Sequence, residues 1–167
     1  RPVAVYASDV NGDGITELPR AVLMAGYKDT SSSDAVYMLD WYAYGIGKVP
    51  AKVATTYQNI SDAWSLLIDQ KWHDRITAIK ANDGGLSYVE FFEYRKNKMS
   101  IPLFNIYCAT GSNREYYAER TDLIQLGQTT QAIYFAKLTN EGEQSELALT
   151  GDEIKARFSL VNQAWNN

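Results

Sequence analysis

Short runs of aromatic and β-branched residues, separated by clusters of Asn, Asp, Gly and Lys, recur along most of this chain. Each run has the length and composition of a β-strand. They cover residues 36–44, 53–58, 64–68, 75–81, 88–95, 101–108 and 132–138. The connections at residues 82–85 and 96–98 are too short for a parallel crossover, so the strands that they join must be antiparallel. The pattern predicts a meander of antiparallel strands.

The end of the chain follows a different period. Thr150 and Glu153 have the spacing of a capping box, which marks the start of a helix. Apolar residues then recur at helical spacing, at Ile154, Phe158, Val161 and Trp165. We therefore expect a helix over residues 151–165 whose apolar face covers the sheet. The predicted fold class is α+β, a mostly antiparallel β-sheet meander with a C-terminal helix packed on it.

Length and charge exclude several classes of function. At 167 residues with 46% hydrophobic content, the chain is long enough to bury a core. Its formal net charge is −4 and its Lys and Arg residues are dispersed, which argues against nucleic acid and against an anionic membrane surface as partners. No apolar run is long enough for a transmembrane segment, and the first residues lack the profile of a signal peptide.

One stretch near the N-terminus has the residue types of a metal site. Asp9, Asn11 and Asp13 offer side-chain oxygens, Ile15 a backbone carbonyl and Glu17 a carboxylate. Gly12 and Gly14 supply the tight curvature that lets these oxygens surround one point. Hard oxygen ligands suit calcium, so we predict a structural Ca²⁺ ion held by these five residues. The alternative is a plain hairpin turn, because Asn-Gly and Asp-Gly are strong turn formers by themselves.

The loop departs from an EF-hand, whose twelfth position is a bidentate Glu. That position is Arg20 here. The alternation of Val3, Val5 and Ala7 before the loop, with Pro19 after it, indicates strands and not helices on its two sides. The sequence therefore predicts a β-hairpin that carries the calcium loop and precedes the main sheet.

Written as D-x-N-x-D-G-x-x-E-L, residues 9–18 resemble the calcium loop of FG-GAP and VCBS repeats. The resemblance implies an ion bound by the side chains of Asp9, Asn11, Asp13 and Glu17 and by the carbonyl of Ile15. Such loops occur in series in bacterial surface proteins. The resemblance thus implies that residues 1–34 are a calcium-loop hairpin segment, the end of a truncated repeat array.

Residues 35–167 form the second predicted unit, an aromatic-rich α+β domain, and the polar stretch 28–34 separates the two. Its start resembles PsbP-like and related small sheet domains of bacterial lipoproteins. The residues that carry this resemblance are Tyr57-Gln58-Asn59, Ala63-Trp64-Ser65-Leu66-Leu67-Ile68, Lys71-Trp72 and Ile76-Thr77-Ala78-Ile79. The resemblance implies a lipid-anchored or secreted domain without known enzymatic chemistry.

Candidate catalytic residues are few. Glu90 and Glu93 should point to opposite faces of one strand, so they cannot act as a pair. Cys108 lies in an apolar run and reads as a buried hydrophobe, and the only histidine, His73, lies in a polar turn. None of the common hydrolase, nucleotide-binding or metalloprotease motifs occurs. We predict no catalytic residues and no cofactor besides calcium.

The aromatic load is high, with twelve Tyr and four Trp. Trp41, Tyr42 and Tyr44 cannot all point inward from one strand, and Tyr116 and Tyr117 adjoin polar residues, so these rings are candidates for a binding face. Core packing is the alternative explanation.

These observations together predict a non-enzymatic, extracytoplasmic binding or structural module of a bacterial lipoprotein, at the cell surface or secreted. Free calcium is plentiful outside cells, and the start without Met suggests a mature fragment whose targeting sequence is missing. The resemblance to lipoprotein domains implies a lipid anchor upstream. The predicted partner is a protein or a glycan at the cell surface. The alternative function is a hydrolase of a cell-wall or extracellular polymer, acting through carboxylates that the fold assembles.

Overall fold

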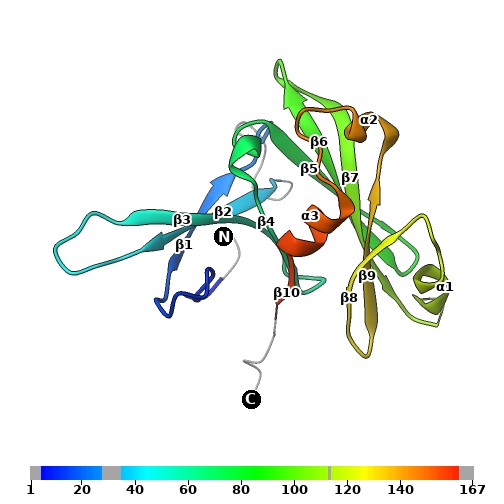
Figure 1. Ribbon diagram of the computed structural model, residues 1–167, viewed down its shortest axis with the longest axis horizontal. Helices are drawn as coiled ribbons and strands as arrows, with labels where there is room; N and C mark the ends of the chain where they lie inside the picture. Colours follow the sequence, from blue (N-terminus) through cyan, green and yellow to red (C-terminus); the bar gives the residue numbers. More distant parts are fainter. Residues whose placement is uncertain (1–4, 28–34, 113, 162–167) are drawn as a thin grey trace.

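The computed structural model describes residues 5–27, 35–112 and 114–161, and about half of these residues lie in two five-stranded antiparallel sheets (Figure 1). The first sheet has the order β1-β2-β3-β4-β10, with bounds Leu18–Leu23, Tyr37–Ala43, Ala51–Asn59, Trp64–Leu67 and Phe158–Leu160. The second sheet has the order β5-β6-β7-β9-β8, with bounds Ile76–Asp83, Leu86–Arg95, Lys98–Thr110, Ala132–Leu138 and Ile124–Gln128. The helices are short: η1 Gln70–Trp72, α1 Arg114–Ala118, α2 Asn140–Glu143 and α3 Gly151–Arg157.

Each of the runs that the sequence marks as a strand overlaps a strand of the structure, and every paired neighbour is antiparallel. The antiparallel pairing is therefore confirmed, but the meander holds only in part, because the strands form two sheets and β9 lies between β7 and β8. The molecule is more β-rich than the predicted α+β fold, because a second sheet replaces much of the expected helical layer. The sequence did not indicate β8, a strand of five residues that contains Gly127 and an irregularity between Gln125 and Gly127.

The larger of two apolar clusters joins the inner faces of the two sheets, and a small second cluster around Phe135 lies on the other face of the second sheet. Tyr57 of β3 meets Phe91 of β6 edge-on, with ring centroids 5.5 Å apart, and Phe91 stacks on Phe104 of β7 at 4.9 Å. Aromatic rings in such arrangements contribute beyond the area that they bury. The aromatic residues of the chain thus serve mainly to hold one sheet on the other.

Helix α3 begins as predicted and ends early. The Thr150 backbone N–H donates to Glu153 Oε2 at 2.7 Å, and the Glu153 N–H donates to Thr150 Oγ1 at 3.2 Å, which completes the capping box. Ile154 is fully buried, and α3 lies against strands of both sheets, β4, β8 and β9. The predicted helix over residues 151–165 is nevertheless wrong at residues 158–161, and residues 162–165 lie outside the described residues.

The chain turns into β10 at Phe158 and pairs with β4, Phe158 lying opposite Leu66. The ring of Phe158 stacks on Trp64 with centroids 5.9 Å apart. Pairing with β4 satisfies the backbone hydrogen bonds of β10 and still buries Phe158. The apolar residue that the sequence placed on a helix face is therefore buried from a strand. Trp165 lies outside the described residues.

The N-terminal hairpin is smaller than expected. Residues 5–7 form no strand, and the pairing before the loop is the single bridge between Ser8 and Glu17. The strand after the loop is β1, where Pro19 is accommodated because β1 is an edge strand. The predicted boundary between residues 34 and 35 adjoins the segment 28–34, which lies outside the described residues. Strand β1 pairs with β2 along its whole length, from Leu18 opposite Tyr42 to Leu23 opposite Tyr37.

Candidate metal centre

The Ser8–Glu17 bridge closes the loop of residues 9–17. The Ser8 N–H donates to the Glu17 carbonyl at 3.1 Å, and the Glu17 N–H donates to the Ser8 carbonyl at 2.9 Å. Between them, Gly12 and Gly14 have φ values of 75° and 83°, a conformation that glycine adopts at little cost. The backbone therefore folds back on itself as the sequence predicts.

Asp9 organises the start of this loop. Its Oδ1 accepts from the backbone N–H of Gly12 at 2.7 Å and of Asp13 at 3.2 Å, and its Oδ2 accepts from Gly14 at 2.9 Å. The hydrogen bond from Gly14, with smaller contributions from Gly12, Asp13 and Asn11, lowers the pKa of Asp9 against the opposing effect of desolvation. Asp9 is therefore an anion at neutral pH.

Asn11 and Asp13 are joined by two hydrogen bonds within the loop. Asn11 Nδ2 donates to Asp13 Oδ2 at 2.9 Å, and the Asp13 N–H donates to Asn11 Oδ1 at 3.1 Å. The Ile15 N–H donates to Asp13 Oδ1 at 2.8 Å, and the Ile15 side chain is half exposed. Asn11 thus lies beside the carboxylates. Its oxygen and the Ile15 carbonyl remain predicted ligands.

Glu17 differs from the other acids because it is completely buried. Its Oε2 accepts from the Val10 N–H at 2.9 Å, whereas Oε1 is buried with no hydrogen-bond partner. A buried carboxylate oxygen that accepts no hydrogen bond is costly, and burying a charge without compensation costs more. A cation bound at Glu17 Oε1 would compensate for the burial of this carboxylate.

Carboxylate oxygens of Asp9, Asp13 and Glu17 lie within 4.8 Å of one another. Calcium binds oxygens at 2.3–2.6 Å, so oxygens around one ion are separated by at most about 5 Å. The three carboxylates fit this limit, and together they supply the negative charge and hard donors that calcium prefers. Within residues 5–27, 35–112 and 114–161, no other group of three acidic, Cys or His side chains has metal-binding geometry.

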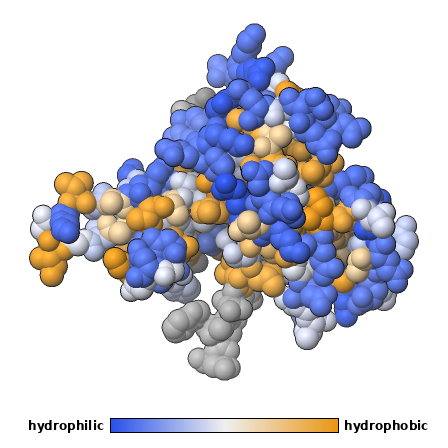
Figure 2. Space-filling model, viewed as in Figure 1, coloured by the Kyte–Doolittle hydropathy of each residue, from blue (hydrophilic) through white to orange (hydrophobic). Residues whose placement is uncertain are grey.

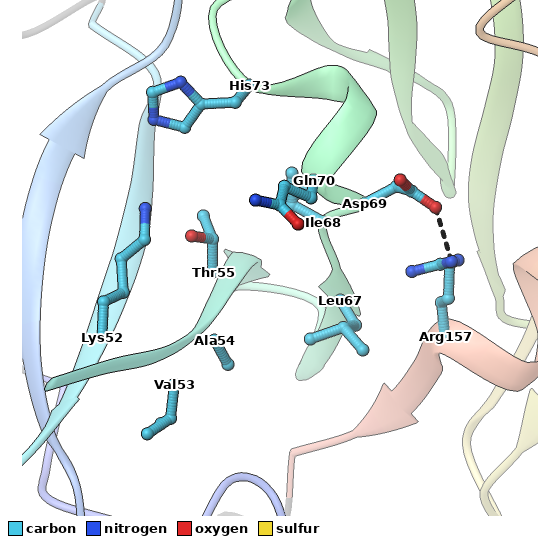
Figure 3. A pocket seen from close by; sticks show the side chains of 10 residues that line it. All are labelled: Lys52, Val53, Ala54, Thr55, Leu67, Ile68, Asp69, Gln70, His73 and Arg157. Carbon is cyan, nitrogen blue, oxygen red and sulfur yellow. Dashed lines mark hydrogen bonds and ion pairs between the residues drawn. The ribbon is translucent and has the colours of Figure 1, made fainter.

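A cavity of about 780 Å³ lies elsewhere, over β3 and β4 beside η1 (Figure 3). Its cationic side chains are already held by acids: Arg157 donates to Asp69 Oδ2 at 2.6 Å, and Lys52 Nζ lies 3.3 Å from Asp40 Oδ1. His73 lies at the rim, paired with Asp74 at 3.2 Å. These charges are satisfied locally, so the cavity offers no group of convergent side chains for chemistry.

The other candidates from the sequence have structural roles. Burial alternates along β6, so Glu93 lies on the core side and Glu90 on the other face, as predicted. Glu93 is almost fully buried and accepts from Arg95 Nε at 2.9 Å and from Ser145 Oγ at 3.0 Å. Cys108 is a buried free cysteine, and burial raises the pKa of its thiol to about 11. A thiol in that environment stays protonated and unreactive.

Comparisons of the chain with family models, with curated proteins and with solved structures returned no match. Among the described residues, no helix is long and apolar enough to cross a membrane.

Proposed function

We propose that this chain is a non-enzymatic extracytoplasmic module of a bacterial surface protein, stabilised by one structural Ca²⁺ ion bound to residues 9–17. The observation that carries the calcium site is Glu17: a completely buried carboxylate, one oxygen of which has no hydrogen-bond partner, beside two further carboxylates. A cation would satisfy that oxygen and remove the repulsion among the three acids. Asp9, Asp13, Glu17, Asn11 Oδ1 and the Ile15 carbonyl are the proposed ligands.

The ion would act on the fold through Glu17. This residue is paired with Ser8 on one side and runs directly into β1 on the other. An ion that fixes Glu17 therefore fixes the loop relative to the edge of the first sheet. Such a role is structural, and the loop contributes no residue to the cavity over β3 and β4.

The partner in this proposal is a protein or a glycan at the cell surface, and the outer face of the second sheet is the surface that supports it. Tyr88, Tyr107 and Phe135 lie in a row across β6, β7 and β9, with centroids 5.2 Å and 5.0 Å apart, and Tyr117 of α1 stacks on Phe135 at 5.4 Å. Phe135 is buried in this row and the other three rings are partly buried, so none presents a fully exposed face on which a sugar could stack. This arrangement favours a protein partner over a glycan.

The alternative, a hydrolase, needs two carboxylates at a substrate cavity. Outside the loop, the two buried acids of the described chain are already engaged: Asp40 by Lys52 and Thr55, Glu93 by Arg95 and Ser145. None of these observations favours a hydrolase, so the binding or structural module is the function that we propose.

Thermal unfolding of metal-stripped protein tests the calcium site. A ligand specific for the native state stabilises it by about 2.7 kcal/mol at a concentration 100 times its Kd. For a chain of this length that corresponds to a rise in Tm of roughly 5–10 °C. Calcium should produce the rise and an equal concentration of magnesium a smaller one, because magnesium retains its water ligands. No shift at millimolar calcium would reduce the loop to a hairpin turn.

A further inference from the structure

The β2–β3 hairpin projects from the body of the molecule as an arm (Figure 1). Edge strand β1 accompanies it only as far as Tyr42, which pairs with Leu18, and the last pair within the arm is Ala43 with Ala51. Every residue from 44 to 53 is exposed. The end of the arm therefore stands free of the rest of the described chain.

A tight turn sets which side chain lies at the apex. The Lys48 N–H donates to the Gly45 carbonyl at 3.1 Å, and Gly47 has a φ of 70°. Positive φ at the third residue is the requirement of a type II turn, and glycine meets it. Ile46 is the second residue of this turn, so its side chain points outward at the corner.

Apolar side chains gather at this apex (Figure 2). Ile46 is fully exposed, Val49 is 89% exposed and Tyr44 is 57% exposed. No other described aliphatic residue approaches these values, since the next, Ile15, is 50% exposed. Two aliphatic side chains held in water at the end of a projecting arm indicate that something covers them when the protein functions.

The charged residues of the arm favour an anionic partner for these apolar side chains. No acidic residue occurs between Asp40 and Asp62, although the chain as a whole has a net charge of −4. Lys52 is held by Asp40 at the base of the arm. At the apex itself Lys48 is the only charged side chain, and it makes no ion pair in the part of the chain that the structure describes.

We propose that the apex of the β2–β3 hairpin inserts into an anionic lipid surface, with Ile46 and Val49 below the headgroups. Tyr44 then lies at the level of the headgroups, where tyrosine is favoured, and Lys48 contacts the lipid phosphates. The net charge and the dispersed Lys and Arg residues of the whole chain predict no contact with an anionic membrane. The arm differs from the rest of the chain because it has no acidic residue between Asp40 and Asp62. Insertion is shallow, because the turn exposes backbone groups that hydrocarbon cannot satisfy.

A protein partner fits the apex less well. A stable protein interface buries about 800 Å² on each side and is centred on aromatic or Arg residues, whereas the apex offers two aliphatic residues on a narrow turn. Pairing of two apices in a dimer meets the same limit. A lipid surface needs no matching shape, so a small apolar apex suffices.

Vesicle co-sedimentation tests this proposal with the whole chain. Protein is mixed with phosphatidylcholine vesicles that contain or lack phosphatidylserine, once with chelator and once with calcium. Wild type should sediment with the anionic vesicles under both conditions. The double variant Ile46→Ser, Val49→Ser should bind at least about tenfold more weakly, because most of the favourable apolar burial is lost. Lys48→Glu should weaken binding to anionic vesicles by about fivefold or more and leave binding to neutral vesicles unchanged.

The matched control is Met99→Ser. Met99 is 48% exposed in the β6–β7 hairpin, beside Lys96 and Lys98, so it tests whether any exposed apolar residue near lysines has the same effect. It should bind as wild type does. Ile46→Cys labelled with an environment-sensitive dye should shift to the blue on anionic vesicles, and buried Cys108 should stay unlabelled.

Three results would overturn the proposal. One is no binding of wild type to anionic vesicles with or without calcium. Another is binding that needs calcium and ignores Ile46 and Val49, which would place the lipid contact at the loop of residues 9–17. The third is a dimer in solution that the double variant dissociates, without vesicle binding, which would make the apex an interface between copies. The calcium site is judged separately by thermal unfolding, so failure of one proposal leaves the other standing.

Discussion

Glu17 and Val10 are joined across the loop by a hydrogen bond of 2.9 Å from the Val10 N–H to Glu17 Oε2, and this bond leaves Glu17 Oε1 buried and unpartnered. The carboxylate is thus fixed in place by one oxygen while the other is available. The arrangement is suited to a ligand oxygen, because its position is set before the ion arrives.

Replacing Glu17 with Gln tests this arrangement. The amide oxygen can still accept from Val10, and the new NH₂ group can donate to Asp9 or Asp13, so the metal-free variant should be at least as stable as wild type. Its calcium-induced rise in Tm should be lost, because a charged ligand is gone. Thermal unfolding with chelator and with millimolar calcium measures both effects. Exposed Glu119→Gln is the control, and a full calcium response in the Glu17 variant would remove Glu17 from the site.

The lowered pKa of Asp9 predicts an acid dependence of stability. A carboxyl whose pKa is lower in the folded state contributes stability that is fully present above its unfolded value, 3.8, and is lost as the pH falls through the folded value. In chelator, the Tm of wild type should therefore fall more steeply below pH 3.8 than that of Asp9→Asn, which keeps an acceptor oxygen but cannot titrate. Identical pH profiles for the two proteins would contradict this role of the Gly14 and Gly12 N–H groups.

Tyr57 predicts a stabilising substitution. Its hydroxyl is buried in the core without a hydrogen-bond partner, while its ring packs against Trp64 and Phe91. Burial raises the pKa of Tyr57, so the group stays a neutral phenol. Tyr57→Phe keeps the ring contacts and removes the unpaired group, which should stabilise the fold by about 1 kcal/mol. Chemical denaturation of the two proteins measures the difference, and a loss of more than about 1 kcal/mol would show that the hydroxyl has a partner.

Gly142 predicts the opposite effect. A Cβ added there would lie 2.2 Å from the Leu103 carbonyl oxygen and 2.6 Å from the Thr139 hydroxyl. Backbone atoms cannot move away easily, so Gly142→Ala should destabilise the protein by roughly 1–3 kcal/mol despite the better helix propensity of alanine. Gly45→Ala is a useful comparison, because its Cβ would meet only the flexible side chain of Lys48, at 3.3 Å. Equal unfolding midpoints for the two variants would contradict the packing of α2 on β7.

Most strands could be predicted because strand propensity and turn chemistry depend on a few neighbouring residues. The run from Tyr37 to Ala43 is a strand whichever sheet contains it, and the Lys96-Asn97 turn closes a hairpin through its own positive φ values. Strand β10 could not be predicted in this way. The spacing of Phe158 from Ile154 fits a continuing helix. Only the pairing of Phe158 with Leu66 shows that the residue belongs to a strand.

The candidate metal centre shows the same division. The spacing of Asp9, Asp13 and Glu17 predicted that their carboxylates would meet, and they do. The burial of Glu17 could not be predicted, because a carboxylate at the start of an edge strand is ordinarily exposed, whereas this one is completely buried. Burial depends on tertiary contacts, and the burial of Glu17 is the observation on which the calcium proposal rests.

Equilibrium dialysis of metal-stripped protein against radioactive calcium tests the central claim most directly, because it counts bound ions without relying on a change in stability. The proposal predicts one calcium ion per chain, retained in the presence of equal magnesium and lost in Asp13→Ala, which removes a central carboxylate but keeps Gly12 and Gly14. No bound calcium at millimolar concentration, or unchanged binding in Asp13→Ala, would contradict it.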